Sequence, residues 1–239
     1  MGLFNKKFCD ICGGKIGMLG NRKLDDGNMC KDCASLLSPF ITDRRRTTLA
    51  EIKDHLAYRE ANKAEVAAFN VTKTLGDRTK VLLDEDAAKF IVTSSSKWKN
   101  DNPDVIAFSQ VTGCNTEIKE HKTELKTKDA EGKSVSYTPP RYRYDYDFKI
   151  TIHINTPWFN EINIQLNRNS IEQRGSVEYQ EFERQANEIR ATLLQIRQDT
   201  RDSITAANAP KTAQICPHCG ATSTPDSHGR CMYCDSAMQ

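Results

Sequence analysis

The chain has 239 residues, of which 38% are hydrophobic and 28% charged, with a formal net charge of +2. This length allows one modest core with small accessory modules, or two ordinary domains. The apolar runs are far shorter than the roughly 20 residues that cross a bilayer, and the start, MGLFNKKFCD, contains no apolar signal core. We therefore expect a cytoplasmic protein without a transmembrane segment.

Eight of the nine cysteines form four CxxC pairs, two towards each end of the chain. Cytosolic thiols are kept reduced, so a disulfide framework is not expected. The spacings are C-x2-C-x17-C-x2-C and C-x2-C-x11-C-x2-C, and two CxxC turns brought together place four thiolates around zinc. We predict two Zn²⁺ per chain. The ligand sets are Cys9, Cys12, Cys30 and Cys33, and Cys216, Cys219, Cys231 and Cys234.

The first module, residues 1–42, has a readable order of elements. Gly13-Gly14 after a CxxC pair is typical of a metal-binding knuckle, and Asp26-Gly27 is a hairpin turn signal. CKDCASLL predicts a helix with cysteines in its first turn, stopped near Pro39. Knuckle, hairpin and helix indicate a treble-clef-like module. Residues 214–239 predict two knuckles joined by a Pro/Gly/Ser-rich loop, which is a zinc ribbon.

Two other interpretations apply to the last module. Cys216 and Cys219 enclose Pro-His, as in the dithiol of a disulfide oxidant. A thioredoxin-type dithiol, however, stands at the start of a helix with most of its fold after it, whereas here a second CxxC pair follows directly. His218 and His228 are alternative metal ligands, but four sulfurs already complete a tetrahedral site. We therefore favour zinc over disulfide exchange.

The middle of the chain changes from helical to alternating periodicity. Residues 43–78 are expected to form a helical neck, with a helix over Thr47–Phe69 that begins at a Thr48/Glu51 capping box, followed by a break at Val71–Thr79. Residues 79–202 then show alternating segments. The predicted strands are Val81–Leu83, Phe90–Thr93, Val105–Val111, Asn115–Glu120, Thr123–Lys126, Ser134–Tyr137, Tyr142–Ile154 and Glu161–Leu166.

The most regular segment, RYRYDYDFKITIHI, alternates strictly from Arg141 to Ile154. Its aromatic and isoleucine side chains fall on one face, from Tyr142 onwards, and its charged side chains fall on the other. This pattern predicts a long antiparallel strand with one face on a core. A nucleic-acid stacking surface is the alternative, but it needs aromatics and cations on the same open face. Cys114 is expected to be a small buried side chain, and Trp98 and Trp158 hydrophobic anchors.

A helix is predicted over residues 177–202, with an apolar stripe spaced alternately by three and four residues from Tyr179 to Ile196. Such a stripe either packs on the strands, which we favour, or forms a coiled-coil seam that makes a homo-oligomer. Residues 203–213 are small and polar, and are expected to be a linker.

The predicted fold class is α+β and multidomain. Antiparallel strands followed by one long helix resemble the pleckstrin-homology-like fold, which implies an antiparallel barrel or sandwich between the two zinc modules. The segments CDICGGKIG and NRKLDDGNMCKDCASLLSP resemble an uncharacterised bacterial family whose members begin with a treble-clef-like four-cysteine domain of unknown function. That resemblance implies no particular activity, and fold alone names no ligand.

No catalytic motif is recognisable in the sequence, and a four-sulfur site lacks the open position of a catalytic zinc. We therefore expect a non-catalytic adaptor that binds a protein partner. Nucleic-acid binding through the zinc modules and Arg44–Arg46 is one alternative, although eight thiolates and two Zn²⁺ would lower the formal charge to about −2, and such a run is usually solvated. Lipid binding by the barrel is another.

Overall fold

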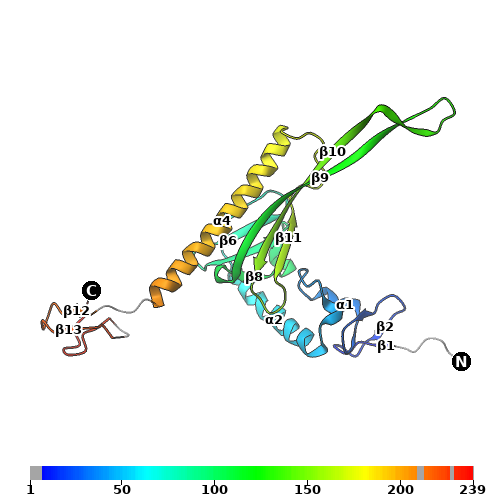
Figure 1. The fold of residues 1–239 in the computed structure, drawn as a ribbon. Helices are drawn as coiled ribbons and strands as arrows, with labels where there is room; N and C mark the ends of the chain where they lie inside the picture. Colours follow the sequence, from blue (N-terminus) through cyan, green and yellow to red (C-terminus); the bar gives the residue numbers. More distant parts are fainter. Residues whose placement is uncertain (1–6, 209–212, 227–228, 239) are drawn as a thin grey trace. The chain divides into compact units, whose positions relative to one another are not determined.

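A computed structural model describes residues 7–208, 213–226 and 229–238. The chain divides into two compact units, residues 1–197 and 198–239, and each is described by itself. Figure 1 shows the elements of both units in chain order.

The first unit begins with two short hairpins and a helix. β1 (Lys7–Phe8) pairs with β2 (Lys15–Ile16), and β3 (Arg22–Lys23) pairs with β4 (Asn28–Met29) across the predicted turn. α1 (Lys31–Ser35) follows, with Cys30 as its N-cap residue. The predicted order of knuckle, hairpin and helix is confirmed, although the helix ends before Pro39 is reached.

The next helix shares a core with these hairpins. After the 3₁₀ turn η1 (Arg44–Arg46), α2 (Leu49–Ala68) begins at the predicted capping box of Thr48 and Glu51. Its buried Ile52 packs with Leu24, Met29 and Cys33 of the four-cysteine module. The expected boundary between residues 1–42 and the neck therefore runs through one hydrophobic cluster.

A four-stranded antiparallel sheet follows α2, in the order β5-β6-β7-β8. Its strands are β5 (Lys73–Leu75), β6 (Lys80–Asp84), β7 (Lys89–Thr93) and β8 (Val105–Ala107). β5 lies in the segment predicted as a break. Gly76 turns the chain from β5 to β6 with φ +75°, where a Cβ atom would lie 2.6 Å from the Thr79 carbonyl oxygen. The short helix α3 (Trp98–Asp101) separates β7 from β8.

A three-stranded antiparallel sheet, in the order β11-β10-β9, comes next. Its strands are β9 (Val111–Lys128), β10 (Ser134–Ile154) and β11 (Glu161–Gln165). β9 and β10 each join two segments that the sequence predicted as separate strands. The predicted strand Val105–Val111 instead consists of β8 and the 3₁₀ turn η2 (Phe108–Gln110).

The predicted closure of these strands into a barrel is not found among the residues that the structure describes. β8 leads through η2 into β9, and the two strands belong to different sheets. The two sheets, together with the last helix, enclose one core that includes Phe90, Phe148 and Ile189. Alternating hydrophobicity shows which face of a strand is buried, but it does not show which strands pair, so the sequence could not distinguish a closed barrel from two sheets.

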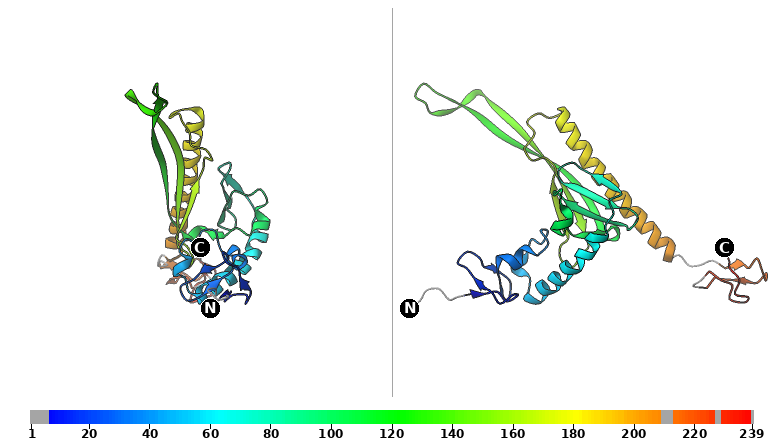
Figure 2. Two further views of the ribbon diagram at one scale, coloured as in Figure 1. Left: turned by 90° about the vertical axis from the view of Figure 1, so that its right-hand side faces the viewer. Right: turned by 180° about the vertical axis from the view of Figure 1, so that it is seen from behind.

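The pairing of β9 with β10 continues beyond the core. Figure 2 shows their outer parts extending past β11 as a two-stranded ribbon, and the two strands are joined by residues 129–133. Tyr142 was predicted to face the core, but its side chain is 42% exposed because it lies on this ribbon. Lys122 covers its ring at 3.9 Å from the centroid. Core burial begins only at Tyr146, which is 7% exposed.

The long helix α4 (Val177–Asn208) packs on the three-stranded sheet. Tyr179 lies edge-on to Phe148 with ring centroids 5.0 Å apart, and Ile189 and Leu193 are fully buried. The predicted packing of the apolar stripe is confirmed, while self-association through this helix stays a prediction. The helix continues to Asn208, into the segment expected to be a linker. Within the described ranges, no helix is both long and apolar enough to cross a membrane.

The second unit contains one further hairpin, β12 (Gln214–Ile215) and β13 (Thr222–Ser223). Cys216, Cys231 and Met238 form its small buried cluster. A cluster of this size cannot by itself supply the free energy that folds a module, which is the situation in which small modules depend on a metal or a disulfide.

Three smaller predictions concern single side chains of the first unit. Cys114 is 2% exposed, and burial raises the pKa of its thiol to about 11, so it is a buried apolar residue as expected. Trp98 packs edge-on against Phe69, and Trp158 edge-on against His55. Both tryptophans are therefore hydrophobic anchors.

A buried polar network joins α2 to the segment before it and to the loop before β8. Arg59 donates from Nη1 to Oδ1 of Asp104 at 2.8 Å, from Nε to the Leu36 carbonyl and from Nη2 to the Asn102 carbonyl. Ser38 Oγ donates to the other oxygen of Asp104 at 2.7 Å. The network thus ties the end of the four-cysteine module, the helix α2 and the loop before β8 to one another.

His55 belongs to the same region and is 1% exposed. Its Nε2 accepts a hydrogen bond from the backbone N–H of Ser38 at 3.0 Å, so the ring is neutral. Burial, together with the nearby positive charge of Arg59, lowers the pKa of His55 to about 4 from an ordinary 6.5. A protonated ring would lose this acceptor and bring a charge into the interior.

We expect the free energy of unfolding to fall as the pH drops from 6.5 towards 4. In this window the unfolded chain protonates His55 while the folded chain does not, so the unfolded state binds more protons and gains stability. The shift corresponds to about 3 kcal/mol at most. Urea unfolding at several pH values measures it. His55→Gln keeps a side-chain acceptor but does not titrate, so equal pH dependence of the two proteins would contradict the assignment.

Candidate metal centres

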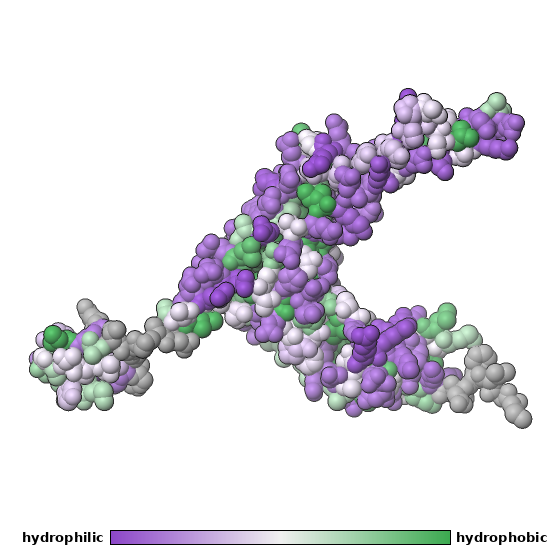
Figure 3. Space-filling view, in the orientation of Figure 1, coloured by the Kyte–Doolittle hydropathy of each residue, from purple (hydrophilic) through white to green (hydrophobic). Residues whose placement is uncertain are grey.

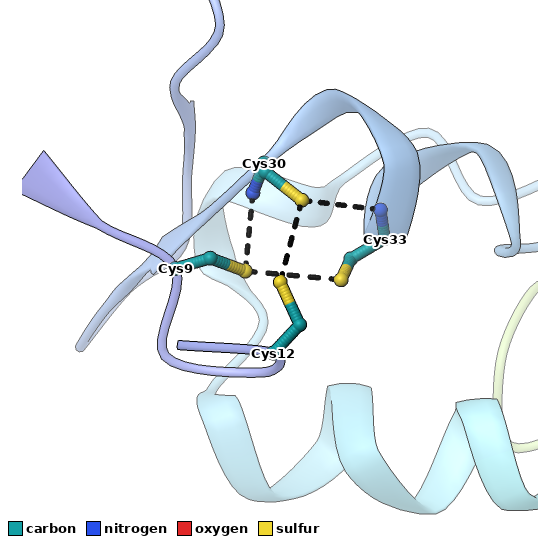
Figure 4. A group of neighbouring side chains, drawn as sticks. All are labelled: Cys9, Cys12, Cys30 and Cys33. Carbon is teal, nitrogen blue, oxygen red and sulfur yellow. Dashed lines mark hydrogen bonds between the residues drawn. The ribbon is translucent and has the colours of Figure 1, made fainter. Parts of the chain in front are cut away.

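The first cluster brings together the four cysteines of the N-terminal module. All four sulfurs lie within 4.8 Å of one another, and Figure 4 shows them turned towards a common centre. Cys9 and Cys33 are 3.8 Å apart between sulfurs, as are Cys12 and Cys30. Four sulfurs bound to zinc at about 2.3 Å form a tetrahedron with edges of about 3.8 Å. The sulfur positions therefore fit a tetrahedral metal ion.

The second cluster, in the last module, has the same geometry. The four sulfurs again lie within 4.8 Å of one another. The distance is 3.5 Å between the sulfurs of Cys216 and Cys234, and 3.7 Å between those of Cys219 and Cys231. A disulfide bond is about 2.05 Å long, and all nine cysteines are free. Two four-cysteine clusters that could each hold a metal ion are thus present, made of the eight predicted residues.

Three of the four CxxC pairs have the same backbone conformation. In each, two backbone hydrogen bonds join the first cysteine to the two residues that follow the second cysteine. The residue after the second cysteine donates its N–H to the carbonyl of the first cysteine, as Gly13 does to Cys9 at 2.7 Å. The first cysteine in turn donates its N–H to the carbonyl of the residue two places after the second cysteine, as Cys9 does to Gly14 at 2.8 Å. The same two bonds are made by Cys216 and by Cys231.

This conformation requires a positive φ at the residue that follows the second cysteine. Gly13, Gly220 and Asp235 occupy that position, with φ values of 72°, 71° and 56°. Glycine adopts such angles without strain, and aspartate tolerates them better than most residues. The Gly13 signal was readable in the sequence. Asp235 was not recognised as its equivalent, although its place directly after a CxxC pair could have indicated it.

The fourth pair, Cys30 and Cys33, lies at the start of α1 instead of in a knuckle. Cys30 is the N-cap residue, and its sulfur accepts a hydrogen bond from the N–H of Cys33 at 3.4 Å. The N–H of Cys30 in turn points to the sulfur of Cys9 at 3.3 Å. Free N–H groups at a helix start favour negative charge, so this end of the cluster is suited to thiolates.

Backbone N–H groups also favour thiolates in the second cluster. The N–H of Tyr233 points to the sulfur of Cys231 at 3.5 Å and, as the largest influence, lowers the pKa of that thiol to about 6. Zinc binds the deprotonated thiol. The backbone around Cys231 thus favours the form of the thiol that a metal ion binds.

The remaining predicted site residues lie outside the clusters. Arg44–Arg46 forms η1, beside β3. His218 is exposed and takes no part in the group of four sulfurs, and His228 lies outside the described residues. Nothing in the sequence pattern associates Arg22 with this run, yet Arg22, Arg44 and Arg45 line the same cleft. Their proximity depends on β3 lying against η1, which only the fold reveals.

Comparison with known proteins extends the description of the first module. A family model described as a domain of unknown function (DUF4428) matches residues 7–55. This range covers the first cluster and runs into α2, in agreement with the core that the module shares with Ile52. No curated protein and no solved structure matches the chain. Residues 7–55 are thus a DUF4428 domain, as the resemblance to a four-cysteine domain of unknown function implied.

Proposed function

We propose that both four-cysteine clusters bind Zn²⁺ and that the chain is a non-catalytic adaptor for a protein partner. Four sulfurs complete a tetrahedral zinc site and leave no position for a substrate or a reacting water. In this proposal the metal supplies folding energy to the modules, and the surfaces of the modules provide the contacts. We also infer a pleckstrin-homology-like arrangement, supported by the four-stranded and three-stranded sheets followed by α4.

Exposed apolar side chains beside both clusters are the observation that carries the adaptor proposal. Met18 and Leu19, in the turn after β2, are 85% and 83% exposed. They line a shallow cleft of about 340 Å³ next to Cys30. In the last module, Met232 and Tyr233 stand between Cys231 and Cys234 and are 72% and 74% exposed. Figure 3 shows hydrophobic surface on both modules.

Such residues are suited to protein contacts. Methionine and tyrosine are enriched at protein interfaces, and methionine adapts its shape to a partner surface. Met232 and Tyr233 lie in a turn between two cysteines of the second cluster, so a metal bound there would hold the turn and little conformational entropy would be lost when these side chains bind. A rigid turn with an apolar tip therefore favours a docking role over a purely structural one.

The proposal predicts that Met232→Ser combined with Tyr233→Ser abolishes partner binding without loss of zinc. Affinity capture with the intact tagged chain, from cells of the source organism, should recover a defined set of proteins. We expect the double variant to lose that set, because its exposed tip is gone while all eight cysteines remain. Val177→Ser is a matched control, since Val177 is 87% exposed but lies at the start of α4, away from both modules in the sequence.

Two results would contradict the adaptor proposal. One is that the wild-type chain recovers nothing above background. The other is that the double variant and the Val177→Ser control recover the same proteins in the same amounts. Zinc content, measured on each preparation, shows whether the module is intact in the variant.

A further inference from the structure

The DUF4428 domain contains a cleft with a strong positive charge. Its volume is about 540 Å³, and it is lined by residues 21–25 and by Arg44 and Arg45. Four of the side chains are cationic, namely Arg22, Lys23, Arg44 and Arg45, and Asp25 is the one carboxylate among the lining residues. The cleft is therefore a local concentration of positive charge on a chain whose total charge is near zero.

These cations have no acidic partners within the part of the chain that is described. The ion pairs found there include Arg46 with Asp43 at 3.4 Å, but none involves the four cations of the cleft. Burial, with the charges of Arg22 and Arg45, lowers the pKa of Arg44. Like charges are thus held together, at a cost that a bound anion would relieve.

Arg44 also has an unsatisfied hydrogen-bond donor. Its Nε is buried and has no partner among the described residues, and the same is true of Oδ1 of Asn21, which lines the same cleft. A buried donor without a partner is costly, and native proteins leave few of them. An anion in the cleft would supply the acceptor that Arg44 lacks.

We propose that this cleft binds a phosphate group, either as the free ion or as the monoester of a small molecule. Arginine presents a planar fork of N–H donors that matches the oxygens of phosphate in pairs. Arg22 and Arg44 approach from different elements, β3 and η1, so that they can hold one anion from two sides. The size of the cleft is in the range of small-molecule sites.

The arrangement favours a compact anion over a nucleic-acid backbone. A nucleic acid requires a basic stripe that follows successive phosphates. Here the cations converge on one cleft, and Asp26 and Asp43 directly adjoin its lining residues in the sequence. These carboxylates would repel an extended polyanion that runs past the cleft more strongly than a single phosphate that contacts only the lining residues.

The test is a calorimetric titration of the full zinc-loaded chain with inorganic phosphate, at constant ionic strength set by chloride. We expect saturable binding at one site. Arg44→Gln and Arg22→Gln should each weaken it about tenfold or more, because each removes a charge-assisted pair of hydrogen bonds. Arg46→Gln is the matched control. It removes the same charge from the same turn, but the Arg46 side chain is 85% exposed and does not line the cleft, so affinity should change less than about twofold.

Melting temperatures show whether a loss of binding reflects a loss of fold. Without phosphate, Arg44→Gln should melt at the wild-type temperature or above, because it relieves repulsion in the cleft. With phosphate, the wild type should be stabilised and the variant should not. If Arg44→Gln fails to fold, Arg22→Gln provides the same comparison. A titration with methyl phosphate in place of inorganic phosphate distinguishes a monoester from the free ion.

Three outcomes would overturn the phosphate site. Wild-type protein could show no saturable heat with either phosphate probe. Arg46→Gln could weaken binding as much as Arg44→Gln, which would indicate general charge attraction. Finally, a single-stranded oligonucleotide could bind in a salt-dependent manner while both phosphate probes do not, which would favour the nucleic-acid alternative instead.

Discussion

Replacing Cys33 by serine is expected to release the zinc ion that we propose for the first cluster and to unfold the DUF4428 domain locally. Cys33 is 6% exposed and packs in the cluster that contains Leu24, Met29 and Ile52, so its loss removes a ligand and a core contact together. Structural zinc supplies about 10–16 kcal/mol of apparent binding energy in small modules, which equals or exceeds the stability of a whole domain.

Hydrogen exchange measured by mass spectrometry checks this result. Protection of the amides in residues 7–37 should fall by at least about 100-fold, equivalent to about 3 kcal/mol. Cys114→Ala is the control, because Cys114 is also a buried free thiol but lies outside both clusters. It should lower overall stability without changing zinc content. Unchanged protection in the Cys33→Ser protein would mean that no metal holds this module together.

Removing Asp104 is expected to have the second largest effect. Its side chain is fully buried, and its Oδ1 forms an ion pair with Nη1 of Arg59 at 2.8 Å. Asp104→Ala therefore leaves a buried guanidinium without its counter-ion. Breaking such a pair from one side costs about 3–5 kcal/mol. The free energy of unfolding from urea titration measures the cost.

Two further variants separate the charge from the packing. Replacing both partners, with Arg59→Met and Asp104→Leu together, should recover most of the loss, because no buried charge then remains. Glu60→Ala removes an exposed pair with Lys63 on the same helix and should cost less than about 0.5 kcal/mol. A cost below about 1 kcal/mol for Asp104→Ala would show that the network does not join α2 to its neighbouring loops.

The two four-cysteine clusters were more predictable from the sequence than the arrangement of the strands. A CxxC pair is a local unit whose turn is fixed by its own hydrogen bonds, as between Cys9 and Gly14. Two such pairs at a short separation can therefore be recognised without knowledge of the rest of the fold. All eight cysteines fall in the two clusters as predicted.

Strand pairing depends on contacts between distant residues, which the sequence pattern does not contain. The alternation of apolar and polar residues correctly predicted which face of β10 is buried from Tyr146 to Ile154. It also placed Tyr142 in the core, because the same alternation continues along the β9–β10 ribbon after the core has ended. β5 was missed because it has only three residues, followed directly by the Gly76 turn.

Buried polar groups were the least predictable part of the structure. Nothing in the sequence distinguishes Arg59 or Asp104 from the many exposed charges of the chain, because their burial depends on α2 lying against the loop before β8. The association of Arg22 with Arg44 depends in the same way on β3 and η1 lying together. Both features arise from tertiary packing and carry no local signal.

The central claim, that the chain holds two structural zinc sites, is tested most directly by the metal content of protein purified without added zinc. Native mass spectrometry and elemental analysis should give two Zn²⁺ per chain, and one in a Cys33→Ser or a Cys231→Ser variant. A wild-type chain without bound metal, with its CxxC cysteines joined in disulfides, would contradict the claim and favour redox chemistry at Cys216 and Cys219.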